Sequence, residues 1–141
     1  MPAADLEAGV VAYLKTVADL AALVDGRVFA GELPARETGS MPRKALVLRR
    51  SGGVSLTGGS HAEADAQRID LFSYGETPRD AGRVMATAAL AMRRLRRSVH
   101  GGVLLQWANP ASGATPDREP QTEWARQFQP FQVMHALEAV A

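Results

Sequence analysis

Residues 69–95 read IDLFSYGETPRDAGRVMATAALAMRRL and predict the central unit of the fold. Ile69, Leu71 and Ser73 occupy alternate positions, so in an extended strand they point to the same side. After a short turn, Thr77-Pro78 provide a helix N-cap and a first helical residue. Apolar residues then recur at helical spacing, which predicts a helix packed on the sheet. The buried side of this helix is expected to consist of Ala81, Val84, Met85, Ala88, Ala89, Met92 and Leu95.

The rest of the chain adds a second helix, further strands and two long loops. Apolar residues at three- and four-residue spacing predict a helix over residues 4–24, which ends at Asp25-Gly26. Residues 52–65 and 109–121 are rich in glycine, proline and small polar residues, and both are expected to be extended loops, the first as a loop or a β-hairpin arm. Strands are expected at residues 27–29, 45–50, 67–74, 103–107 and 124–137, the last as a strand pair or as one strand bent at Pro130.

This order of elements predicts an α+β fold, in which an antiparallel or mixed β-sheet of about four to five strands is packed by two helices. The length of 141 residues fits one domain, residues 1–141. The composition, 46% hydrophobic and 22% charged, is close to that of an average globular protein. No apolar run approaches the ~20 residues of a membrane span, and the absence of cysteine excludes disulfides and thiolate metal sites.

Candidate catalytic groups are few and isolated. His61, Glu63 and Asp65 alternate, so on a strand they would share one face and offer ligands to a divalent cation, but no second cluster completes the coordination sphere. Ser60, next to His61, lacks the glycine context of a nucleophile elbow. His135 alternates with apolar neighbours, as a half-buried histidine of a sheet does. The sequence therefore predicts no catalytic residue, no metal ligand and no cofactor, and a protein that is not an enzyme.

Basic residues gather at the end of the second helix. Arg93, Arg94, Arg96 and Arg97 cover most of the helix surface outside the position of Leu95. Cations at a helix C-terminus are favoured by the helix dipole, which is a purely structural reason for the cluster. The alternative is contact with acidic partner subunits or with a nucleic-acid backbone. The sequence leaves both readings open.

Four segments, in this order, resemble one known family. They are the end of the opening helix with LAALVDGRVF (20–29), the loop of Leu33-Pro34 and Met41-Pro42 before the strand at 45–50, RIDLFSY (68–74) with the alanine-rich helix from Pro78, and the closing strand FQVMH (131–135). Together they cover most of the chain. In this order and spacing the chain is similar to the tail terminator, or tail-completion, proteins of long-tailed bacteriophages and gene transfer agents.

The resemblance implies a structural role in a virion. Such proteins form a hexameric ring that caps the tail tube when it has reached its final length, and the ring offers the surface on which the head connector docks. The implied partners are further copies of the chain, the major tail tube protein and the head-tail connector or stopper. DNA passes through the lumen without sequence-specific binding, and no membrane is involved. The implied location is the tail or neck of the virion, assembled in the cytoplasm of a bacterial host.

The same analogy implies that the two long loops contact a neighbouring subunit, the tube or the lumen. The residues expected at such interfaces are Arg49, Arg50, Ser55, Thr57, His61, Glu63, Arg93, Arg94, Arg96, Arg97, Arg118 and Glu119. Other readings are another neck component (a stopper, typically a small β-barrel, an adaptor, typically a helical bundle, or a minor tail protein), a small metal-dependent enzyme using His61, Glu63 and Asp65, and a nucleic-acid-binding module using the arginines at 93–97.

Overall fold

The central strand and helix form as the sequence predicts. In this computed structural model, which describes residues 2–140, they are β3 (Ala64–Gly75) and α4 (Pro78–Arg93). The Thr77 side chain accepts a hydrogen bond from the backbone N–H of Asp80 at 3.1 Å and caps α4. The buried hydroxyl of Ser73 donates to the carbonyl oxygen of Ala81 at 2.8 Å. This bond ties the strand directly to the first turn of the helix that follows it.

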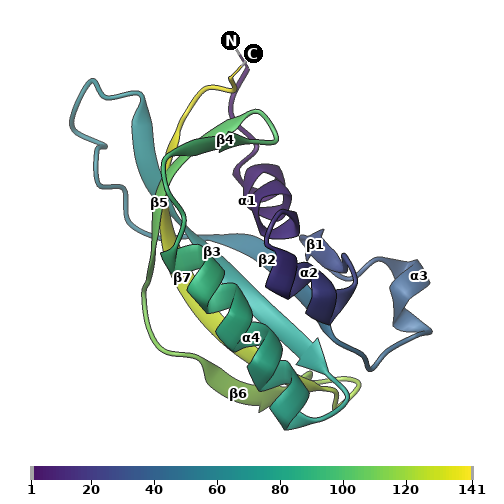
Figure 1. Ribbon diagram of the computed structural model, residues 1–141. Coiled ribbons are helices and arrows are strands. Elements are labelled where there is room, and N and C mark those ends of the chain that lie inside the picture. Colours follow the sequence, from purple (N-terminus) through teal and green to yellow (C-terminus); the bar gives the residue numbers. More distant parts are fainter. Residues whose placement is uncertain (1, 141) are drawn as a thin grey trace.

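The architecture is α+β, with the helices gathered on one face of a strongly curved, mixed sheet (Figure 1). The strand order is β1-β2-β3-β7-β5-β4, and β6 pairs with β7 beyond the end of β5. β1 is parallel to β2, and every other pairing is antiparallel. The other strands are β1 (Val28–Ala30), β2 (Ala45–Gly52), β4 (Ser98–His100), β5 (Val103–Pro110), β6 (Thr115–Arg118) and β7 (Ala125–Ala136).

The expected number of about four to five strands is too low, since the sheet has seven strands. The strands that the sequence pattern misses are β4 and β6, which have three and four residues and are too short to show an alternation. β4 and β5 form a hairpin in which His100 pairs with Val103. Gly101 and Gly102 form its two-residue turn with φ of 57° and 75°.

The prediction of one helix over residues 4–24 is wrong. The chain forms α1 (Leu6–Lys15) and α2 (Ala18–Val24), separated at Thr16 and Val17. The Thr16 hydroxyl donates to the carbonyl oxygen of Tyr13 at 2.6 Å, and Val17 is extended with ψ of 109°. The break changes the helical phase, so that Leu20 becomes fully buried. A further single turn, α3 (Ala35–Thr38), lies in the loop between β1 and β2, so the structure has four helices where two were expected.

Of the two loops expected from the sequence, the first is a loop in the structure and the second is partly strand. The chain between β2 and β3, residues 53–63, is a loop, as predicted, and is called the arm below. Residues 109–121 are not one extended loop, because β5 continues to Pro110 and β6 lies inside this range. β7 is one continuous strand through Pro130 rather than a strand pair. The bridge between Ala3 and Glu138 places the first and last described segments side by side (Figure 1).

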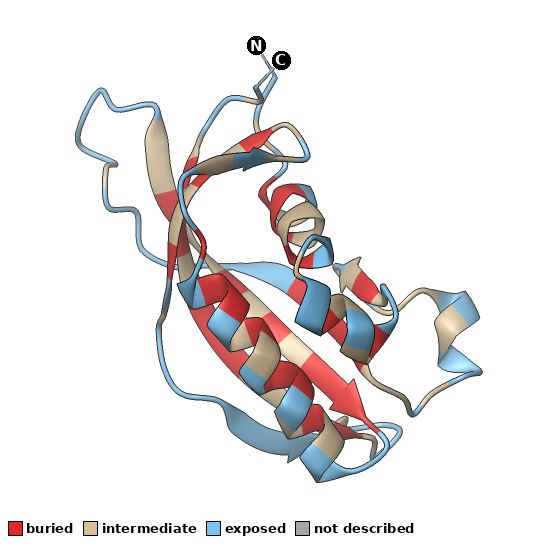
Figure 2. Ribbon diagram, in the orientation of Figure 1, coloured by how far each residue is buried: buried red, intermediate tan, exposed pale blue. Residues whose placement is uncertain are grey.

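The core lies between the sheet and α1, α2 and α4, where buried residues face one another (Figure 2). Ile69 and Leu71 of β3 and Phe131 of β7 are fully buried in it. The buried side of α4 agrees with the prediction except at Ala89, which is half-buried, and Ala91, which is buried and was not expected to be. No helix formed by residues 2–140 has the length and apolar composition needed to cross a membrane.

The contact of α1 with the β4–β5 hairpin depends on Gly9. A Cβ atom at this position would lie 2.7 Å from the Cβ of Val103 and 3.2 Å from the carbonyl oxygen of His100. We expect Gly9→Ala to lower the free energy of unfolding. The added methyl group overpacks the contact, which costs about 1–3 kcal/mol. This cost exceeds the roughly 1 kcal/mol that alanine gains over glycine in helix propensity. Urea denaturation measures this change.

Gly39→Ala is the matched control. Gly39 has φ of −70° and nothing within 4 Å of an added Cβ atom. Equal urea midpoints for the two variants would show that α1 does not approach the hairpin as closely as described.

Candidate functional site

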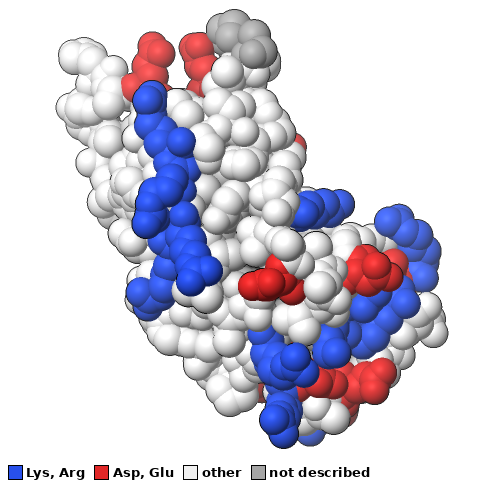
Figure 3. Space-filling model, viewed as in Figure 1, with Lys and Arg blue, Asp and Glu red and all other residues white. Residues whose placement is uncertain are grey.

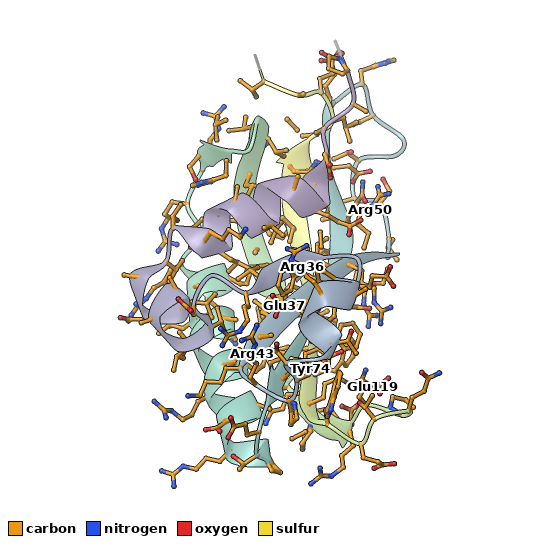
Figure 4. All side chains as sticks on the ribbon, turned by 90° about the vertical axis from the view of Figure 1, so that its right-hand side faces the viewer. Arg36, Glu37, Arg43, Arg50, Tyr74 and Glu119 are labelled. Carbon is orange, nitrogen blue, oxygen red and sulfur yellow. The ribbon has the colours of Figure 1, made fainter. Side chains whose placement is uncertain are left out.

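The residues expected at interfaces do not converge on one site. They lie in four places: the arm, the second half of β2, the chain after α4, and the turn between β6 and β7. Figure 4 shows Arg50 and Glu119 well apart on one side of the molecule. The expected interface residues therefore form several separate areas of the surface.

The arm is held in place by Asp65, the second residue of β3. Its carboxylate accepts hydrogen bonds from the hydroxyl of Ser55 and from the backbone N–H groups of Leu56 at 2.8 Å and Thr57 at 3.2 Å. The Ser55 hydroxyl, with the N–H groups of Ala66, Leu56 and Thr57, holds the pKa of Asp65 well below its usual range. The carboxylate therefore stays charged, and the bonds to the arm stay formed, well below the pH at which an ordinary aspartate is protonated.

The rest of the arm is exposed, as the pale blue loop in Figure 2 shows. The Thr57 hydroxyl donates to the carbonyl oxygen of Ala64 at 2.5 Å and closes the base of the arm. Val54 is 74% exposed and Leu56 is 55% exposed. The arm thus presents two apolar side chains to solvent from a backbone that is fixed at its base.

His61, Glu63 and Asp65 do not come together as ligands for a metal ion. Asp65 is engaged with the arm, whereas His61 and Glu63 are exposed. In the part of the chain that the structure describes, no group of three or more His, Asp or Glu side chains could hold a metal ion. Ser60, the candidate nucleophile, donates its hydroxyl to the carbonyl oxygen of Thr57 at 3.0 Å.

His135 lies in β7, as predicted, but is more deeply buried than the half-buried position that was expected. It is 2% exposed, and its Nδ1 donates to the carbonyl oxygen of Ala136 at 2.8 Å. Its Nε2 has no hydrogen-bond partner among residues 2–140. Its cross-strand neighbours are Asp65 and Leu105.

The sheet face turned away from the helices has an aromatic centre. Phe72 and Phe128 are cross-strand partners with ring centroids 5.2 Å apart. The guanidinium groups of Arg49 and Arg126 lie 4.6 and 5.0 Å from the centroid of the Phe72 ring. Arg49 is therefore part of this stack, whereas Arg50 lies 3.5 Å from a carboxylate oxygen of Glu7.

The arginine cluster lies at the end of α4 and directly after it, and all its members are exposed: Arg93, Arg94, Arg96 and Arg97. Figure 3 shows a column of basic side chains on the part of the surface where α4 leads to β4. Arg96 donates to the carbonyl oxygens of Leu95 at 3.3 Å and of Arg93 at 3.5 Å, the interaction expected of a cation at a helix end. Within residues 2–140, the four guanidinium groups form no ion pair.

Arg118 and Glu119 form hydrogen bonds within the turn before β7. Arg118 donates to the carbonyl oxygen of Glu123 at 2.9 Å. The Glu119 carboxylate accepts from the hydroxyl and N–H of Thr122, both at 2.7 Å, and the Thr122 hydroxyl is the main cause of its lowered pKa. Both side chains thus have a local structural role.

One surface feature was not predicted: a groove of about 520 Å³ between α2 and α4. Its exposed apolar residue is Leu90, which is 47% exposed. A smaller hollow of about 140 Å³ continues it toward Tyr13 and Arg94. The apolar spacing in α4 indicates only the side of the helix that faces the sheet. Leu90, an isolated leucine on the outward side, was the signal in the sequence for the groove. The groove is lined by Asp19, Ala22, Leu23, Arg83, Ala86, Thr87 and Leu90.

Comparison with known proteins identifies the fold and not a family. No family model matches the chain, and no curated protein matches its sequence. A solved structure that is similar is a chain in the virion of a native gene transfer agent particle, with a TM-score of 0.66 and 16% sequence identity. The match covers 93% of this chain and 94% of that one. At this identity the two chains share a fold over nearly their whole length.

Replacing Asp65 should release the arm. We expect Asp65→Ala to increase hydrogen exchange and protease cleavage in residues 53–63, because the carboxylate is the common acceptor of the arm's N–H and hydroxyl groups. Hydrogen-exchange mass spectrometry measures the change. Glu63→Ala is the control, because the side chain of Glu63 forms no hydrogen bond or ion pair within residues 2–140. Unchanged exchange in the arm of Asp65→Ala would show that the arm is ordered by other contacts.

Proposed function

We propose that this chain is a structural subunit of a phage-like particle, and that it acts as a tail terminator. In this role, copies of the chain form a ring, expected to be hexameric, that caps the tail tube and provides the joining surface for the head connector around the DNA channel. The chain acts as one domain, with the major tail tube protein, the connector or stopper and its own copies as partners. Its place is the tail or neck of the virion, and it is assembled in the host cytoplasm.

The observation that supports this proposal most strongly is the fold shared with a gene transfer agent virion chain over 93% of this chain and 94% of that one. Since fold alone does not determine function, the surface has to agree with it. A subunit of a closed ring needs two different contact faces, and the arm and the α2–α4 groove are two such faces.

The mixed architecture favours a terminator over the other neck components. A stopper is expected to be a small β-barrel and an adaptor a helical bundle. The seven strands here form an open sheet with β1 and β4 at its two ends, and the helices cover one face. This arrangement matches neither of the two alternatives.

The arginine cluster is assigned to contacts with subunits or tube rather than to specific binding of DNA. Residues 78–97 contain six arginines and one aspartate, a formal charge of +5, whereas the whole chain has a net charge of +1. The basic charge is therefore local, and the rest of the surface is acidic on balance. A channel through which DNA slides is better served by weak contacts, because each neutralised phosphate adds to the affinity.

The proposal is tested by mass and by electron microscopy. We expect rings of about six subunits, as the resemblance implies, or caps on the ends of purified tail tubes mixed with the chain. Tubes incubated with an unrelated protein of similar size are the control. A chain that stays monomeric and leaves tube ends bare would contradict the terminator role.

DNA binding should be weak and independent of sequence. If all four arginines of the cluster contact phosphates, log K should fall with log salt with a slope of no more than about −4, and binding should disappear near physiological salt. Fluorescence anisotropy of a labelled duplex measures the slope, with Arg93→Ala/Arg94→Ala/Arg96→Ala/Arg97→Ala as the comparison. Tight binding to one sequence that resists salt would favour a nucleic-acid-binding module instead.

A further inference from the structure

The arm and the α2–α4 groove both present apolar side chains at the surface. The arm offers Val54 and Leu56, the two most exposed large aliphatic side chains within residues 2–140. The groove offers an apolar surface that includes Leu23 and Leu90 and an open volume of about 520 Å³. Exposed aliphatic side chains and an open apolar groove both favour burial against a partner.

Charge supports the same pairing. The arm contains no Lys or Arg, and Glu63 is its only carboxylate. On the other side, Arg83 lines the groove and Arg94 lines its continuation. Neither arginine forms an ion pair with the described residues, and both are exposed. A carboxylate that enters with the arm therefore meets two cations without an ion-pair partner among the described residues, beside one carboxylate, that of Asp19, which lines both the groove and its continuation.

The two surfaces belong to different ends of the molecule. Figure 1 shows the arm at the upper left, where β3 begins, and the helices that form the groove nearer the lower right. The arm is also fixed at its base by Asp65 and Thr57, so it cannot fold back over the helices. A contact between the arm and the groove therefore joins two copies of the chain.

We propose that the arm of one copy, with Val54 and Leu56, docks into the α2–α4 groove of the next copy, where Glu63 approaches Arg83 and Arg94. This inference rests on the proposed function and names the contact that closes the ring. A pair of copies joined in this way still presents one free arm and one free groove. Such a head-to-tail contact repeats until the last arm meets the first groove.

Cysteine cross-linking tests the contact directly, because the chain has no cysteine of its own. Leu56→Cys and Ala86→Cys are prepared as separate proteins, one with an affinity tag, then mixed and oxidised mildly. We expect a mixed disulfide dimer from this pair. Val99→Cys is the matched control for Ala86→Cys, since Val99 is 51% exposed on β4 and belongs to neither surface. A mixed dimer with Val99→Cys as abundant as that with Ala86→Cys would overturn the contact.

Charge substitutions provide the second test. Leu56→Asp and Leu90→Asp should each weaken self-association by about tenfold or more, the effect of removing one apolar contact worth roughly 1.4 kcal/mol. Val99→Asp should leave it unchanged, and circular dichroism confirms that all three proteins fold. Glu63→Arg should weaken association, and Arg83→Glu/Arg94→Glu should restore it in a mixture of the two proteins.

The failure of this contact and the failure of the proposed function are distinguishable. If Leu56→Asp and Leu90→Asp still form rings or cap tube ends, the arm–groove contact is wrong and the terminator role stands. If the unmodified chain does not associate at any concentration, Leu56→Cys and Ala86→Cys give no mixed disulfide, and tube ends stay bare, both are wrong. Rings that form only in the unmodified chain and in Val99→Asp confirm the contact.

Discussion

The full-length pairing of β3 with β7 is the interaction on which the other elements depend. The two strands pair over all twelve residues, from Ala64 with Ala136 to Gly75 with Ala125. On the helix side this pairing places Ile69 next to Phe131, both fully buried. Burying side chains of this size contributes about 1.5–3 kcal/mol each. On the other side it places Phe72 next to Phe128 and forms the aromatic stack.

All remaining parts are positioned by these two strands. β2 pairs with β3 on one edge, and β5 and β6 follow one another along the other edge of β7. The buried bond from Ser73 to Ala81 sets where α4 begins, and α4 in turn forms one wall of the groove with α2. The arm leaves from the opposite end of β3. One strand pair thus determines the separation of the two surfaces that we assign to subunit contact.

Much of the fold could be predicted from the sequence wherever one pattern extended over many residues. The alternation in β3 and the apolar spacing in α4 are long enough to average out local exceptions. Short elements such as β4 depend on tertiary contacts, since three residues do not establish a period. The break between α1 and α2 was missed because the apolar spacing continues across it, and the local bond from Thr16 to Tyr13 is not visible in that spacing. The candidate site was harder to predict, because the partners of Asp65 are separated from it by eight to ten residues and the groove is formed by outward-facing positions.

The bridge between Ala3 and Glu138 has a practical consequence. Because the two ends of the described chain meet at one place, a short peptide can connect them, and new ends can be opened at an exposed turn such as Gly113, which has free space around it. For the same reason, a fluorescent protein or enzyme fused to either end would lie on the same side of every subunit. A ring of such subunits would display its fused cargo next to the arms, because the backbone N–H of Leu137 donates to the carbonyl oxygen of Glu63 at 2.9 Å and holds the chain ends beside the arm.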